Sequence, residues 1–209
     1  MSQTLTKVLN VSVILLWIAA SALFAPFLVY QWSSSLLPPY IWSILLQAPA
    51  IALLCTQVSP KPKFSRPTIR MGVATLLGLL IMAGTYFILA HVPPINISIP
   101  WLSSLPRPLY IQTPLLMWLT ACLIGPFIEE YLYRGLLVYF MQKQEITLIV
   151  QAIISSLLFS VLHLNSHGLI PLFIMGLLLF SLRTQFKSLT APLILHIAYN
   201  ATLLALFQI

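Results

Sequence analysis

The sequence is short of acidic and charged residues. The chain of 209 residues has three glutamates and no aspartate, and only 6% of its residues are charged. Soluble domains carry about 25% charged residues, so this composition excludes an ordinary soluble enzyme. The two cysteines, Cys55 and Cys122, form no CxxC pair. Neither a disulfide framework nor a thiolate metal site is expected.

Apolar residues take the place of charge, at 60% of the chain. A membrane-spanning helix needs about 20 predominantly apolar residues. We predict seven such spans, at residues 8–30, 39–58, 71–91, 114–142, 146–165, 168–184 and 188–207. The expected fold is an all-α polytopic membrane protein with about seven transmembrane helices around a buried polar cavity. The sixth span is short, and a re-entrant segment is the alternative there.

The basic residues lie mainly in alternate loops between these spans. One side carries eight of the ten: Lys7, Lys61, Lys63, Arg66, Arg70, Lys143, Arg183 and Lys187. The other side has only Arg107, and Arg134 lies within a span. This bias predicts a cytoplasmic N-terminus and an external C-terminus. The compact loops and the absence of an organelle signal favour a bacterial inner membrane over an endoplasmic reticulum. The loop bias explains the net charge of +7 without nucleic acid, which we do not expect as a partner.

Two of the three acids fall together inside the fourth span, in "GPFIEEYLYRG" at 125–135. Unpaired charges in hydrocarbon are costly, so these side chains should pair or face a polar cavity. Glu130 and Arg134 are four residues apart, the spacing of a helical ion pair. Glu129 points about 100° away from Glu130. We therefore expect Glu130 to be held by Arg134 and Glu129 to be left for chemistry. The preceding Gly-Pro predicts a kink or steep tilt of this span.

Further polar residues lie in two other spans. His163 ends "FSVLH" (159–163), with Phe159 one turn before it, and His196 begins "HIAYN" (196–200), with Asn200 one turn after it. Either histidine alone would be interpreted as a hydrogen-bonded packing residue. Together with the glutamates and the arginine they predict one interior polar site built from three helices.

The three patterns resemble a known family. "EEYLYR" (129–134) matches EExxxR, "FSVLH" matches FxxxH and "HIAYN" matches HxxxN. Their order and spacing resemble the CPBP family, the CAAX proteases and Abi proteins, which are polytopic intramembrane endopeptidases. The resemblance covers about 129–200. We expect a single membrane domain over 1–209, with spans lacking any motif in 1–112 and the catalytic core in 113–209.

The resemblance implies a role for each residue. Glu129, assisted by His163, would activate a water that attacks the scissile carbonyl. His196 and Asn200 would hydrogen-bond the developing oxyanion, and Glu130 would orient the site through Arg134. Phe159 would support the site structurally. The implied substrate is a membrane-associated or transmembrane protein or peptide, with membrane lipids as surroundings.

Several alternatives remain open at this point. Zinc could bind to Glu129, His163 and His196, although HExxH is absent; we favour a mechanism without a cofactor. A non-proteolytic member of the same family could act as a scaffold, a bacteriocin-immunity protein or a regulator. A proton-coupled transporter would also use buried glutamate and histidine, but the sequence shows no inverted repeat.

Overall fold

The computed structural model describes residues 62–89, 114–163 and 168–207, together with the single positions 13, 16, 20 and 52. The described helices belong to one compact unit, which comprises residues 62–104 and 110–209. The first two predicted spans, 8–30 and 39–58, lie outside the described residues except for those single positions.

The described part is helical throughout and contains no strand. Its helical segments are α3 (Ile69–Leu89), a continuous composite helix over 114–143, α8 (Leu148–Leu162), α9 (Leu169–Phe186) and α10 (Thr190–Phe207). These correspond to the third to seventh predicted spans, with no end shifted by more than three residues. The all-helical class is therefore confirmed for this part, and the number of seven spans stays a prediction.

Local sequence explains most of the helix ends. The Thr68 hydroxyl accepts a hydrogen bond from the Met71 N–H and caps the start of α3. Pro171 and Pro192 lie in the first turns of α9 and α10, where a missing N–H costs nothing. Lys187 ends α9 in the left-handed conformation, with a φ of 50°.

The composite helix alternates between α and π geometry. It runs through α5 (Pro114–Leu119), η1 (Thr120–Ile124), α6 (Gly125–Glu129), η2 (Glu130–Leu137) and α7 (Val138–Lys143). The Gly125 N–H bonds to the Thr120 carbonyl, five residues back, one residue before Pro126. This wider turn makes room for a proline ring that would clash with the carbonyl four residues earlier. At Gly-Pro, where the sequence predicts a kink or a steep tilt, the structure has a π turn.

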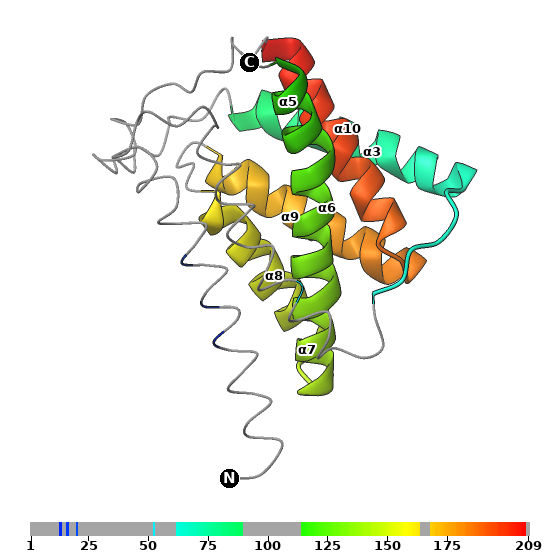
Figure 1. Cartoon of the computed structure of the whole chain (residues 1–209), viewed down its shortest axis with the longest axis vertical. Helices are drawn as coiled ribbons and strands as arrows, with labels where there is room; N and C mark the ends of the chain where they lie inside the picture. Colours follow the sequence, from blue (N-terminus) through cyan, green and yellow to red (C-terminus); the bar gives the residue numbers. More distant parts are fainter. Residues whose placement is uncertain are drawn as a thin grey trace. The chain divides into compact units, whose positions relative to one another are not determined.

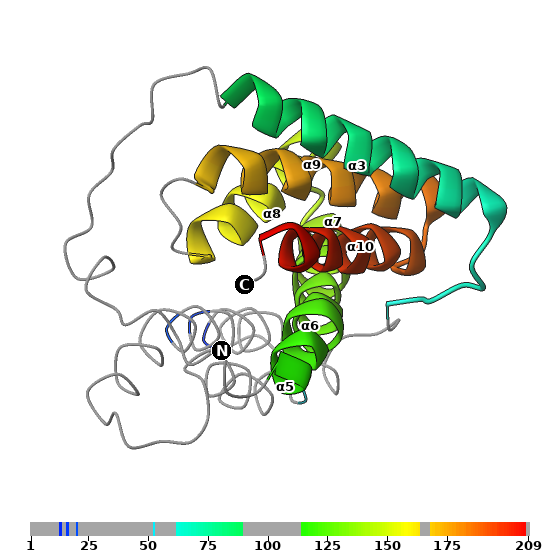
Figure 2. The same ribbon diagram turned by 90° about the horizontal axis from the view of Figure 1, so that it is seen from above.

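Helix α9 packs against three neighbours, α8, α3 and α10 (Figures 1 and 2). Its contact with α8 is close: a Cβ added at Gly176 would lie 2.7 Å from the Ser156 Cβ and 2.8 Å from the Ser156 Cα. The composite helix crosses this group and contacts α8, α9 and α10. This arrangement brings the motif-bearing helices together.

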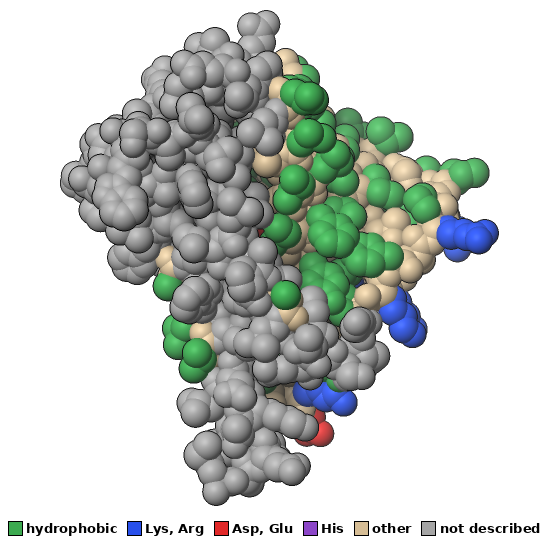
Figure 3. All heavy atoms as spheres, viewed as in Figure 1, with side chains coloured by type: hydrophobic (Ala, Val, Ile, Leu, Met, Phe, Trp, Pro, Cys, Tyr) green, Lys and Arg blue, Asp and Glu red, His purple; other side chains and the backbone are tan. Residues whose placement is uncertain are grey.

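Much of the apolar surface of this unit is exposed. Helices α3 and α9 are long and apolar enough to cross a membrane by length and composition. Large apolar side chains on α3 are open to the surroundings, with Ile69 87% and Leu80 68% exposed. Figure 3 shows apolar side chains over a broad part of the described face. Soluble monomers rarely expose so much apolar surface, whereas helices in lipid do.

Candidate active site

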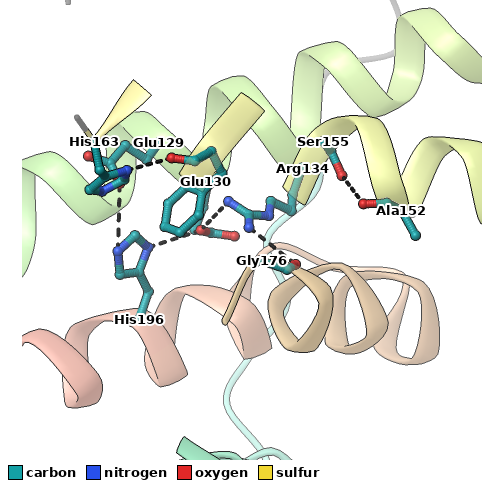
Figure 4. A network of polar contacts seen from close by, with 9 residues as sticks. Glu129, Glu130, Arg134, Ala152, Ser155, His163, Gly176 and His196 are labelled. Atoms are coloured by element: carbon teal, nitrogen blue, oxygen red, sulfur yellow. Dashed lines mark hydrogen bonds and ion pairs between the residues drawn. The ribbon is translucent and has the colours of Figure 1, made fainter. Parts of the chain in front are cut away.

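The predicted ion pair is present and fully buried. The Arg134 Nη1 donates to the Glu130 Oε1 at 3.1 Å, and both side chains are 0% exposed. The Nη2 of the same guanidinium donates to the Gly176 carbonyl at 3.2 Å and so links η2 to α9 (Figure 4). Two charge-assisted hydrogen bonds therefore hold the guanidinium in place, as a buried charge requires.

Glu130 has a second partner in His196. The His196 Nδ1 lies 3.0 Å from the same Glu130 Oε1, and the imidazole is almost fully buried. A carboxylate paired with a guanidinium accepts hydrogen bonds, so we assign the donated proton to the His196 Nδ1. This bond fixes the orientation and the tautomer of His196, and it leaves the Nε2 with a free lone pair.

Glu129 faces two imidazole rings, from α10 and from the end of α8. Its Oε2 lies 3.6 Å from the His196 Nε2 and 3.7 Å from the His163 Nε2 (Figure 4). The Oε2 itself is buried and has no hydrogen-bond partner. By contrast with Glu130, the Glu129 side chain as a whole is 30% exposed, and so is His163 at 31%. The side chains of Glu129 and His163 thus form the open edge of the site.

Phe159 packs among the polar groups. Its ring is 0% exposed and lies 4.5 Å from the His163 ring and 5.4 Å from the His196 ring, both edge-on. The Arg134 guanidinium lies 4.4 Å over its face, a favourable cation–π position. Phe159 can support the site because its one ring packs against two imidazoles and a guanidinium.

Asn200 lies one turn beyond His196 on α10, but its amide is engaged elsewhere. The Asn200 Nδ2 donates to the Ala121 carbonyl in η1 at 2.7 Å. The π turn exposes this carbonyl, because the regular α-helical bond to it is replaced. In this structure the amide ties α10 to the composite helix, a contact that the sequence did not predict.

The structure therefore brings together six of the seven residues that the sequence singled out, from α6, η2, the end of α8 and α10, whereas the Asn200 amide bonds to Ala121. Comparison with protein families shows that the family described as Type II CAAX prenyl endopeptidase Rce1-like matches residues 111–202. Over this segment the chain is similar to a family of CAAX peptidases. The comparison with curated proteins gave no match, and that with solved structures gave none.

In the segment that this family model matches, three polar atoms converge. The His163 Nδ1 bonds to the Phe159 carbonyl, which can only accept, so we assign the proton to Nδ1, which leaves a lone pair on Nε2 of a neutral imidazole. The same assignment follows for His196, whose Nδ1 bonds to Glu130. Both lone pairs face the Glu129 Oε2 at distances too long for a direct hydrogen bond. A shared proton, or a water that donates its protons, is what such a trio can bind.

The same trio comprises the alternative zinc ligands. Their residue types suit zinc, yet the described residues contain no group of three or more His, Cys, Asp or Glu arranged to hold a metal ion. The Asn200 amide is bonded to a carbonyl and does not join them. The zinc content of the purified protein tests this alternative.

Two contacts around the candidate active site had no signal in the sequence. The Gly176 carbonyl, which binds Arg134, belongs to a glycine in an apolar run and matches no motif. The Tyr86 hydroxyl on α3 and the Tyr199 hydroxyl on α10 lie 2.7 Å apart. Tyr199 precedes Asn200, so this bond anchors α10 at the level of the site. Both contacts join helices distant in the chain, which helical periodicity does not reveal.

Proposed function

We propose that the chain is an intramembrane endopeptidase that hydrolyses a peptide bond with water activated by Glu129. The supporting observation is the buried, unpartnered Oε2 of Glu129 between two imidazole Nε2 atoms. A buried polar atom without a partner calls for a functional explanation. A water at this point would meet one carboxylate and two imidazole lone pairs, which together orient it and take up its proton.

In the first step, the water oxygen forms a bond to the scissile carbonyl carbon. The water proton moves to the Glu129 Oε2, and the carbonyl π electrons move to the oxygen, which becomes an oxyanion. His163 positions the water through its Nε2, because the Phe159 carbonyl fixes its ring. The expected contribution of such a positioned base is about 10²–10⁴-fold in rate.

In the second step, the oxyanion electrons reform the carbonyl and the bond from carbon to nitrogen breaks. The proton held by Glu129 passes to the departing amine, so Glu129 serves as base and then as acid. This restores the carboxylate and balances the reaction without a cofactor. The open edge formed by the Glu129 and His163 side chains is the side from which a substrate can approach.

His196 and Asn200 would stabilise the oxyanion in this mechanism. His196 can donate from its Nε2 only after that atom takes up a proton, since its Nδ1–H is already used by Glu130. That proton is the one removed from the water: it passes from the Glu129 Oε2 to the His196 Nε2, 3.6 Å away, while the oxyanion exists, and returns to Glu129 before it is delivered to the amine. Asn200 keeps a second N–H for the oxyanion while its first holds the Ala121 carbonyl.

The substrate proposed for this site is a membrane-associated or transmembrane protein or peptide. We further propose a cytoplasmic N-terminus, on the basis of the loop charges, and a bacterial inner membrane, on the basis of the compact loops. Topology reporters inserted in 59–70 and placed after Ile209 should read cytoplasmic and external, respectively. Reporters that read on the same side would show that the number of spans is wrong.

The test of the function is cleavage of membrane peptides by purified full-length protein. Glu129→Gln should abolish activity while the protein stays folded, because the amide has nearly the same size and cannot take the proton. Glu145→Gln is the matched control, since Glu145 is the only acid outside the site and is exposed on a turn. His163→Ala should also abolish activity, and Asn200→Ala should lower it by about 10²–10³-fold. Full activity of Glu129→Gln would refute the protease.

Metal is measured in the same samples. One zinc per chain, lost in both His163→Ala and His196→Ala with reversible silencing by chelators, would refute the proposed metal-free mechanism. A different outcome is that the wild type cleaves no peptide while Glu129→Gln supports cell growth and binds its membrane partner as well as the wild type does. That combination would instead favour the non-proteolytic scaffold or regulator.

A further inference from the structure

An irregular segment outside the active site is held in place by buried hydroxyl groups. Residues 62–68, just before α3, have no regular secondary structure, yet their backbone is bonded to the turn between α9 and α10. The Ser65 N–H lies 3.0 Å from the Ser188 Oγ and 2.9 Å from the Thr190 Oγ1, and the Thr190 hydroxyl donates to the Ser65 carbonyl at 2.7 Å. The Leu189 N–H donates to the Lys63 carbonyl at 2.9 Å.

This attachment gathers basic residues from two parts of the chain. Lys63 and Arg66 come from the irregular segment, and Arg183 and Lys187 come from the last turn of α9 and its end. We refer to these four residues as the basic cluster. In Figure 3 the Lys and Arg side chains lie along the edges of the described face and not over its apolar centre.

No acid of this chain is available to neutralise the basic cluster. The whole sequence has three glutamates, and two of them form the ion pairs of the active site. The third, Glu145, lies on the turn after α7, beyond Lys143. The hydrogen bonds of Ser65 and Leu189 hold together the two parts of the chain that carry these cations, and like charges in one region repel one another unless anions from outside accompany them. The basic cluster is therefore matched to an external anion.

The position of the basic cluster identifies the class of that anion. Both candidate spans end there, since α3 begins at Ile69 and α9 ends at Phe186. The end of a span lies at the level of the lipid headgroups. Apolar side chains beside the cluster are exposed, with Phe64 45% and Ile69 87% open. An acidic peptide in water would match the charge but not these apolar neighbours.

We propose that the basic cluster is a binding site for the headgroup of an anionic phospholipid. The phosphate would lie among the four cations, and the acyl chains would cover the exposed apolar side chains at the start of α3. A basic residue near an anionic membrane surface contributes about fivefold in affinity. The hydrogen bonds of Ser65 hold residues 62–68 against the turn after α9. They thereby bring Lys63 and Arg66 toward the end of α9, which carries the other two cations.

The test uses the full-length chain in neutral detergent, titrated with phosphatidylglycerol and with phosphatidylcholine that carry a fluorescent tail. The wild type should prefer phosphatidylglycerol, and the preference should weaken as salt rises. The double variant Arg66→Gln and Lys187→Gln should lose about fivefold in phosphatidylglycerol affinity for each charge removed. The control Lys143→Gln removes one charge at the end of α7, outside the cluster, and should change the affinity by less than about twofold.

A further pair of variants separates charge from folding. Arg66→Lys with Lys187→Arg keeps the charges and should bind phosphatidylglycerol like the wild type. Glu129→Gln should also bind normally, so that a failure of the proposed protease leaves this result intact. Equal affinity for both lipids, an equal loss per removed charge in the double Gln variant and in Lys143→Gln, or binding of an acidic peptide without any lipid preference would overturn the lipid site.

Discussion

Removal of the Arg134 side chain should destabilise the protein and not merely inactivate it. Arg134→Ala leaves the Glu130 carboxylate at 0% exposure without its guanidinium. Breaking a buried ion pair on one side typically costs about 3–5 kcal/mol. The variant also loses the bond to the Gly176 carbonyl and the packing on the Phe159 ring. Because these losses add to the first, we expect the upper part of that range.

A set of matched variants separates charge from volume. Arg134→Met keeps much of the volume but strands the carboxylate, so it should be nearly as unstable as Arg134→Ala. Adding Glu130→Gln removes the stranded charge and keeps an acceptor for the His196 Nδ1–H. The double variant should therefore recover about 1–3 kcal/mol relative to Arg134→Met, the cost of an unsatisfied buried group.

The assay is unfolding in detergent, followed by helicity against temperature and denaturant, with abundance in membranes as a second measurement. Arg134→Lys is informative as well, since it restores a positive charge but not the fork that reaches both Glu130 and the Gly176 carbonyl. Wild-type stability in Arg134→Ala, or a double variant less stable than Arg134→Met, would contradict this reasoning. Either result would show that Arg134 does not stabilise the fold by neutralising the buried Glu130 carboxylate.

Two further predictions concern helix packing. Gly176→Ala should destabilise the fold by about 1–3 kcal/mol, because the new Cβ meets the Ser156 backbone at 2.8 Å; Gly84→Ala, with nothing within 4 Å, should be neutral or slightly stabilising by the same unfolding assay. Tyr86→Phe and Tyr199→Phe should each cost about 0.5–1.5 kcal/mol. Their effects should be non-additive in a double-mutant cycle, and additive losses would rule out the hydrogen bond as the cause.

The sequence by itself determined which helices form and which residues are candidates for chemistry. Apolar runs of fixed length predicted the described helices to within a few residues, because a helix in lipid must satisfy its backbone internally. The rarity of acids made Glu129 and Glu130 conspicuous. The spacing of four residues predicted the ion pair with Arg134, since residues one helical turn apart share a face. All of these are local properties of one segment.

The tertiary structure decided how the helices meet, because contacts between distant residues leave no periodic signal. It placed His196 on the oxygen that Arg134 already binds, and so decided which imidazole nitrogen faces Glu129. It paired the Asn200 amide with the Ala121 carbonyl, which is open to a side chain because of the π turn. It also attached residues 62–68 to the start of α10, where the buried Thr190 hydroxyl bonds to the Ser65 backbone. Each outcome depended on where a polar group found its partner among packed helices, because a buried donor or acceptor must find one.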